Sequence, residues 1–89
     1  MKHIVKRKGH TEIFDERKVY ASVYAACLAV RTPEGSAELN AEKISSHIKE
    51  WLEDKKEVTS KDIHRVVVKH LKAYNPDAAL LHETHHILD

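Results

Sequence analysis

The chain has 89 residues, with 15 Lys+Arg against 14 Asp+Glu and a formal net charge of +1. This length predicts a single domain, residues 1–89, whose core is too small to enclose a deep cleft between two lobes. The balanced charge argues against a general nucleic-acid or membrane binder, so any anion site must come from the local placement of charges.

The first predicted element is a β-hairpin over residues 2–14. Short apolar runs around Ile4 and Ile13 flank Lys8 and Gly9, and Gly9 can adopt the positive φ that a tight turn requires. A two-residue loop at Lys8 and Gly9 would place Ile4 opposite Ile13. Because an isolated hairpin is marginal in water, we expect this one to pack against the rest of the domain.

Apolar residues at helical spacing predict four further elements. The predicted helices cover about residues 16–31, 40–55, 60–74 and 76–88. Asp15 is the expected N-cap of the first helix, and Cys27 lies on its apolar side, where a buried packing role is expected. Pro33 and Gly35 are expected to separate the first helix from the second.

The second half of the chain carries clear helix-start signals. Thr59 and Asp62 match a capping box, and Asn75 with Pro76 should open the last helix. Val58 can extend as a short third strand. We therefore predict an α+β domain, a four-helix bundle capped at its N-terminus by a small β-hairpin or a three-stranded sheet.

Residues 82–86, HETHH, match the H-E-x-x-H signature of zinc proteases. His82 and His86 should share one face of the last helix, opposite Leu80 and Leu81, so we expect both histidines to face solvent. A zinc protease needs a third ligand and an enclosed substrate cleft, and a small domain offers neither. We expect no enzyme, and a metal site at His82 and His86 is left open as a weak alternative.

Positive charges gather around the first helix start. Arg17 and Lys18 lie in its first turn, where the helix dipole disfavours cations, and Lys6 and Arg7 precede them in the hairpin. One interpretation is a solvated basic edge. The other is an anion site of the helix-terminus type, in which a polyphosphate would turn local repulsion into attraction.

Carboxylates and hydroxyls accompany this basic cluster. Glu12 and Asp15 could simply cap and pair with the cations, or they could accept hydrogen bonds from the amino group of a base. Thr59 lies at a second helix start, although capping alone explains that residue, and His64 follows about one turn later. A site that combines groups attracting phosphate with groups attracting an amine fits an adenine nucleotide better than inorganic phosphate.

The segments VKRKGHTEIFDERKV and VTSKDIHRVVVKHL, in this order, resemble the ATP-cone domain over essentially the whole chain. The resemblance implies a four-helix bundle capped by a small sheet, with a nucleotide bound between the two. By this resemblance, Ile4 and Phe14 would border the base, Glu12 and Asp15 would bind the adenine amino group, and Lys6, Arg7 and Lys18 would hold the phosphates. Val19 would form the pocket floor, and Thr59 and His64 would contact the phosphate or ribose.

The resemblance also implies a regulatory role. ATP-cones bind ATP or dATP as an effector, which Mg²⁺ could accompany, and the nucleotide changes how subunits associate, best known in ribonucleotide reductases and a repressor of their genes. The 89 residues hold no catalytic or DNA-binding segment, so we expect action on a protein partner or through homo-oligomers, in the cytoplasm, since no signal peptide or long apolar run is present.

Two departures from the family pattern bear on the site. Lys8 replaces the usual Asp in the hairpin turn, and the last helix, which often ends with aromatic and basic residues in the family, reads LLHETHHILD here. A phosphate ligand is therefore missing or replaced by histidine. The alternative to a nucleotide sensor is a helical interaction or oligomerisation module whose nucleotide site has decayed.

Overall fold

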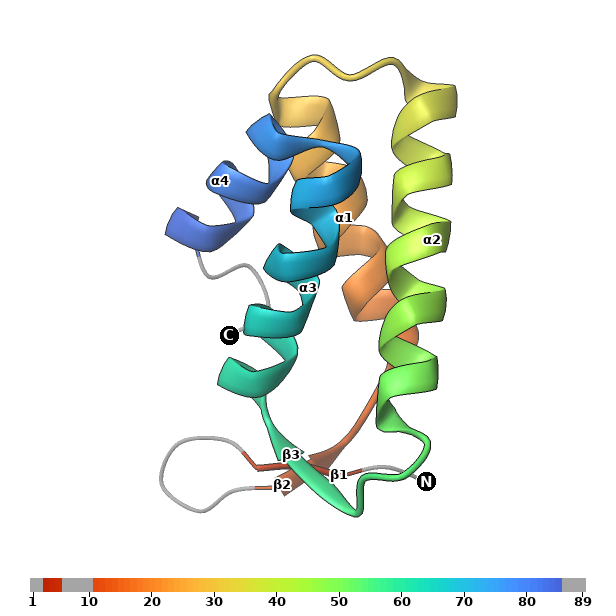
Figure 1. Ribbon diagram of the computed structural model, residues 1–89, viewed down its shortest axis with the longest axis vertical. Coiled ribbons are helices and arrows are strands. Elements are labelled where there is room, and N and C mark those ends of the chain that lie inside the picture. Colours follow the sequence, from red (N-terminus) through yellow and green to blue (C-terminus); the bar gives the residue numbers. More distant parts are fainter. Residues whose placement is uncertain (1–2, 6–10, 86–89) are drawn as a thin grey trace.

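The computed structural model describes residues 3–5 and 11–85, with side chains described from 13 to 84. The domain is mainly helical, as predicted, and three short strands lie at one end of the helices (Figure 1). In chain order the elements are β1 (His3–Val5), β2 (Thr11–Ile13), α1 (Glu16–Ala29), α2 (Glu34–Leu52), β3 (Glu57–Thr59), α3 (Ser60–Tyr74) and α4 (Pro76–His85).

The strand order is β2-β1-β3, with β2 antiparallel and β3 parallel to β1. The predicted register is wrong by one position, because Ile4 pairs with Glu12 and Ile13 pairs with His3. Val5 pairs with Thr11, which leaves an odd number of residues between the strands, whereas the predicted two-residue turn requires an even number. The predicted turn itself lies outside the described residues. A shift of one residue exchanges the faces of a strand, so the correction matters for any site on this sheet.

Helix α1 begins where the cap signal predicts, with Asp15 as N-cap. Its buried residues recur at three- and four-residue steps, which is the pattern of one face packed on a core: Val19, Ser22, Val23, Ala26 and Cys27. The helix ends at Ala29, slightly before the predicted end, and Arg31 has a φ of 63°. This left-handed residue stops the helix and turns the chain toward α2.

Helix α2 begins at Glu34, well before the predicted start near residue 40. Pro33 is its N-cap, and Gly35 falls in the first turn, where a glycine does not stop a helix. Two alanines with no exposed surface, Ala37 and Ala41, continue the buried stripe upward from Ile44. The prediction missed this extension because alanine is a weak apolar signal.

Helix α3 has the predicted capping box. The Thr59 side chain accepts a hydrogen bond from the Asp62 N–H, and the Asp62 side chain accepts one from the Thr59 N–H, both at 3.1 Å. The buried face includes Ile63, Val67 and Leu71.

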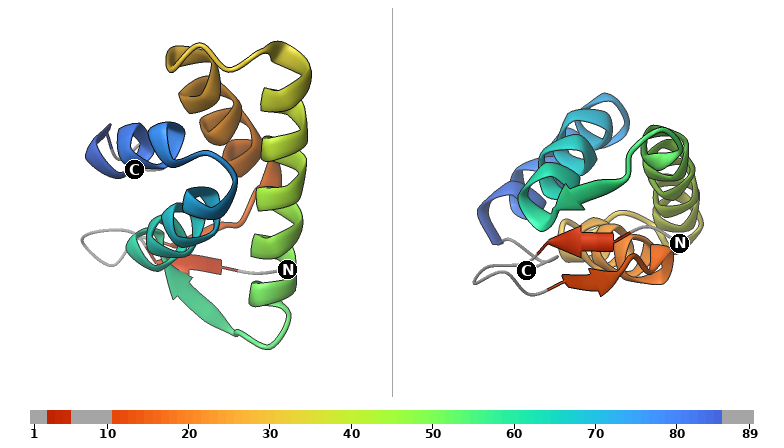
Figure 2. Two further views of the ribbon diagram at one scale, coloured as in Figure 1. Left: turned by 45° about the horizontal axis from the view of Figure 1, so that its top comes forward. Right: turned by 90° about the horizontal axis from the view of Figure 1, so that it is seen from below.

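Helix α4 follows a cap at Asn75, whose Oδ1 accepts from the Ala78 N–H at 3.2 Å. The Asn75 amide also donates to Thr32 Oγ1 at 2.9 Å, which ties the α3–α4 junction to the α1–α2 connection. The two views in Figure 2 show α4 beside α3, away from α2. No helix in the described part of the chain is both long and apolar enough to span a membrane.

The buried face of α4 differs from the predicted one. Leu80 is 61% exposed, whereas Ala78, Ala79 and His82 have no exposed surface. The small alanines let α4 approach the bundle closely, and the His82 ring fills the space that remains. The prediction that His82 faces solvent is therefore wrong, and His86 lies outside the described residues.

Candidate functional site

The sheet register brings parts of the predicted site into adjacent rows. Ile4 of β1 lies between Glu12 of β2 and Val58 of β3, and the next row places Val5 beside Thr59. These are backbone positions. Residues far apart in the sequence, from the first strands and from the start of α3, thus meet at one end of the bundle.

At the start of α1 the charges of Asp15 and Arg17 compensate each other. The Asp15 carboxylate accepts from the Arg17 backbone N–H at 3.0 Å and from the Arg17 guanidinium at 3.1 Å and 3.0 Å. The hydrogen bonds from Arg17 lower the pKa of Asp15, and the same pairing raises the pKa of Arg17. Arg17 is therefore not the uncompensated cation that the sequence suggested, because its charge is matched by the cap itself.

Three more predicted residues lie near this helix start. Lys18 is exposed, and its charge helps to lower the pKa of Asp15. Val19 is 1% exposed and belongs to the core, while Phe14 is partly buried against that core. Of these three residues, Phe14 has apolar surface that a ligand can reach, and Lys18 is an exposed cation.

The start of α3 carries a capping box formed by Thr59 and the Asp62 carboxylate. The Thr59 hydroxyl oxygen accepts from the Asp62 N–H, and its hydrogen is directed to the Asp62 carboxylate. Hydrogen bonds from the Thr59 backbone and side chain lower the pKa of Asp62, and Arg65 lies 3.2 Å from the other carboxylate oxygen. A hydroxyl at a helix N-terminus suits an anionic oxygen.

His64 packs against a polar chain inside the bundle. Its ring stacks on the His82 ring with centroids 5.0 Å apart, and His82 Nε2 lies 3.1 Å from Ser22 Oγ. Ser22 donates its hydroxyl hydrogen to the Val19 carbonyl at 2.9 Å, so its oxygen accepts from His82 and the Nε2 atom of His82 carries a proton. This series of side-chain contacts joins α1, α3 and α4, and it includes His64, a residue of the predicted site.

The sequence did not reveal that His82 stacks on His64 or that Ser22 contacts His82. Ser22 falls on the apolar stripe of α1, and a polar residue within such a stripe usually makes a hydrogen bond in the core. That signal could have pointed to Ser22, but not to its partner.

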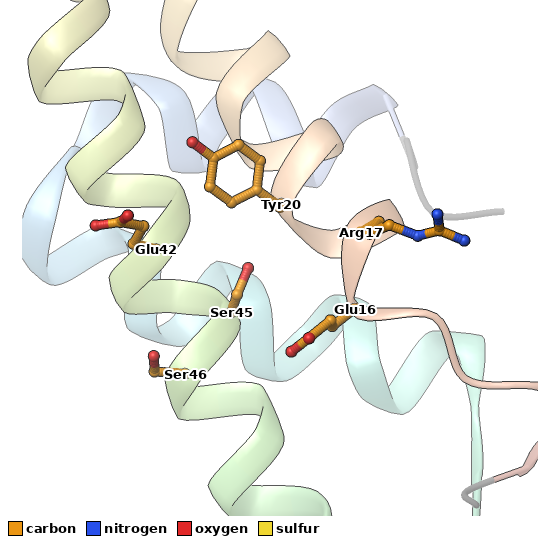
Figure 3. A pocket seen from close by; sticks show the side chains of 6 residues that line it. All are labelled: Glu16, Arg17, Tyr20, Glu42, Ser45 and Ser46. Carbon is orange, nitrogen blue, oxygen red and sulfur yellow. The ribbon is translucent and has the colours of Figure 1, made fainter.

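A hollow lies elsewhere, between α1 and α2 (Figure 3). It has a volume of about 450 Å³ and is lined by Glu16, Arg17, Tyr20, Glu42, Ser45 and Ser46. No residue of the predicted nucleotide site lines it. A second hollow of about 420 Å³ lies further along α2, against Tyr74.

Metal ligands do not cluster within the described ranges, where no three His, Cys, Asp or Glu side chains are placed to share an ion. His82 is buried against Ser22, so it is not available on a solvated histidine face. Cys27 is fully buried, as predicted, and burial raises the pKa of its thiol. A raised pKa keeps this cysteine in its unreactive thiol form.

The described members of the predicted site form two groups, one at the start of α1 and one at the start of α3. Both helices begin directly after strands that flank β1. Lys6 and Arg7 lie outside the described residues, as do the side chains of Ile4 and Glu12.

Comparison with known proteins gives one match. The family model for the ATP cone domain matches residues 2–83, nearly the whole chain. No curated protein and no solved structure matches. The matched range contains the capped starts of α1 and α3 and the strands that precede them. The chain therefore belongs to the ATP cone domain family, and it is a nucleotide-binding regulatory domain.

Proposed function

We propose that this domain binds ATP or dATP between the sheet and the helical bundle. The observation that carries the proposal is the family match over residues 2–83. Its geometric support is the sheet register, which lines up Glu12, Ile4 and the start of α3 within neighbouring rows.

The phosphates are assigned to the start of α3. The backbone N–H groups of a helix N-terminus attract anions, and the Thr59 hydroxyl could turn from Asp62 to donate to a phosphate oxygen. Lys6 and Arg7 follow Val5 in the sequence, and Val5 pairs with Thr59, so these cations would join the same end of the ligand. Mg²⁺ would then bind through phosphate oxygens rather than through a protein cage.

The base is assigned to the α1 side of the sheet. Phe14 is only partly buried and supplies apolar surface there, Val19 lies behind it in the core, and Ile4 would border the same region. Of the two proposed adenine readers, Asp15 already binds Arg17 through both oxygens, so Glu12 is the stronger candidate to accept from the adenine amino group. Lys18 remains the α1 cation that we assign to the phosphates.

Nucleotide binding would act as a regulatory signal without catalysis. The bound nucleotide must favour one associated state over another, either homo-oligomers or a complex with a protein such as ribonucleotide reductase. A nucleotide-independent interaction module is the alternative, and it predicts association that ATP does not alter. Sedimentation velocity with and without ATP separates the two.

The site itself is tested by calorimetric titration of ATP and dATP. Arg7→Ala combined with Lys18→Ala should weaken binding about 100-fold, because two charge-assisted contacts to phosphate are lost. The matched control is Lys69→Ala with Lys72→Ala, which removes the same charge from exposed positions near the far end of α3. Equal affinities for the two double variants would contradict the assignment.

A further inference from the structure

An aromatic and acidic surface lies along the seam between α1 and α2. Tyr20 and Tyr24, one turn apart on α1, stack with ring centroids 6.2 Å apart and an interplanar angle of 16°. Tyr20 lines the hollow of about 450 Å³ together with Glu42 and Ser45 of α2 (Figure 3). This volume is within the range of small-molecule sites.

Negative charge at this seam is only partly compensated. Glu38 and Glu42 lie one turn apart on α2, and neither has an ion pair within the described part of the chain. Burial raises the pKa of Tyr20, and the charges of Glu38 and Glu42 raise it further, which places both carboxylates near this ring. Like charges one turn apart repel each other, so the protein alone gains nothing from this arrangement.

The cations nearest the hollow are already engaged. Lys49 lies 3.5 Å from Glu16, and both side chains are largely solvated. The Arg17 guanidinium points away from the hollow and binds Asp15 (Figure 3). The hollow thus has room for a cation that the described residues do not supply.

Ser45 gives an independent indication of a ligand. This residue is 9% exposed, it lines the hollow, and its hydroxyl points toward the Tyr20 ring (Figure 3). Its Oγ is buried and has no hydrogen-bond partner among the described residues. A buried hydroxyl without a partner destabilises a folded protein, and a ligand N–H that displaces the groups covering this oxygen beside Tyr20 removes that cost.

We propose that the hollow between α1 and α2 binds a small organic amine in its ammonium form. Glu42 balances the charge, the Tyr20 ring contacts the cation through its face, and the Ser45 hydroxyl accepts an N–H. Carboxylates and aromatic faces are the groups that bind alkylammonium ions in proteins. The site is separate from the proposed nucleotide site, so either can exist without the other.

The probe is 1,4-diaminobutane, titrated into the ¹⁵N-labelled domain without nucleotide, since amines also associate with ATP. Saturable shifts of the Tyr20 and Ser45 amides are expected. Glu42→Gln should raise the dissociation constant about tenfold, because a charge-assisted contact is lost. Glu83→Gln, which removes the same charge from an exposed position on α4, should leave binding unchanged.

The variant Ser45→Ala tests whether the unpartnered hydroxyl belongs to a ligand site or is only a packing defect. This variant should bind the amine about three- to tenfold more weakly while its melting temperature stays level or rises, because a buried hydroxyl without a partner is removed. Shifts that grow linearly without saturation would overturn the proposal. So would equal shifts from MgCl₂ at matched ionic strength, equal weakening in Glu42→Gln and Glu83→Gln, or unchanged binding in Ser45→Ala.

Discussion

Two stacked histidine pairs lie in very different surroundings in this small domain. His64 and His82 stack inside the bundle, with centroids 5.0 Å apart, and His82 has no exposed surface. His47 and His70 stack on the seam between α2 and α3, with centroids 4.6 Å apart and an interplanar angle of 5°. The same ring chemistry therefore serves once as core and once as surface.

The hydrogen-bond partners show the consequence of this difference. His82 must donate from Nε2, because the hydroxyl hydrogen of Ser22 is used on the Val19 carbonyl. His47 Nε2 lies 3.1 Å from the hydroxyl of Tyr74, which is 43% exposed and can donate or accept. The contact between His82 and Ser22 therefore has one workable direction, whereas the contact between His47 and Tyr74 can run either way.

The largest expected effect is the loss of the buried ring. His82→Ala should lower the free energy of unfolding by about 2–4 kcal/mol, since it leaves a cavity and removes the hydrogen bond to Ser22. The surface control, His47→Ala, should cost under about 1 kcal/mol. Urea unfolding of both variants measures the difference, and equal losses would show that the two pairs are energetically alike.

A smaller effect is expected from the partner of that ring. Ser22→Ala should cost about 1–3 kcal/mol, because the Nε2–H of His82 then lacks its acceptor in a buried site. Ser22→Ala combined with His82→Leu should recover part of the loss, since both polar groups are then gone. Losses that simply add in the double variant would mean that the two residues do not act together.

The surface pair should be visible in the pH dependence of stability. Burial lowers the pKa of His70 below 6.5, and the charges of His47 and Lys69 lower it further. As pH falls, the unfolded chain binds this proton first, so stability is full above 6.5 and declines as the pH falls from there through the lowered folded-state value. His70→Gln should flatten the unfolding free energy over this window. A slope that is unchanged in this variant would assign the dependence to other groups.

The smallest effect is expected at the exposed hydrogen bond. Tyr74→Phe should change the unfolding free energy by less than about 0.5 kcal/mol, because water replaces the lost contact to His47. Thermal unfolding of this variant beside Ser22→Ala compares an exposed and a buried hydrogen bond directly. A loss at Tyr74 as large as at Ser22 would contradict the distinction between the two pairs.

Much of the fold was predictable because its signals are local. The caps at Asp15, Thr59 and Asn75 need only short-range hydrogen bonds, and all three are present. The apolar stripes of α1 and α3 were equally clear. The start of α2 was missed, because Ala37 and Ala41 give little hydrophobic signal although they are fully buried.

The residues assigned to the candidate site remain predictions. Family resemblance directed attention to the segments around Asp15 and Thr59, and the match over residues 2–83 confirms the family itself. The sequence left open whether Asp15 pairs with the neighbouring cations or accepts from a base, and the structure shows Arg17 bound to Asp15. The hollow beside Tyr20 was not foreseen, since it needs two helices to pack before it exists.

The sequence by itself determined the starts of α1, α3 and α4, the amphipathic faces of α1 and α3, and membership of the family, because these depend on residues close together in the chain. Only the tertiary structure decided the strand register, the burial of His82 against Ser22, and the acidic hollow between α1 and α2. These features join residues from different elements, and their energies arise only when those elements pack. Hydrophobic periodicity over a ten-residue helix such as α4 is too weak to fix which side faces the core.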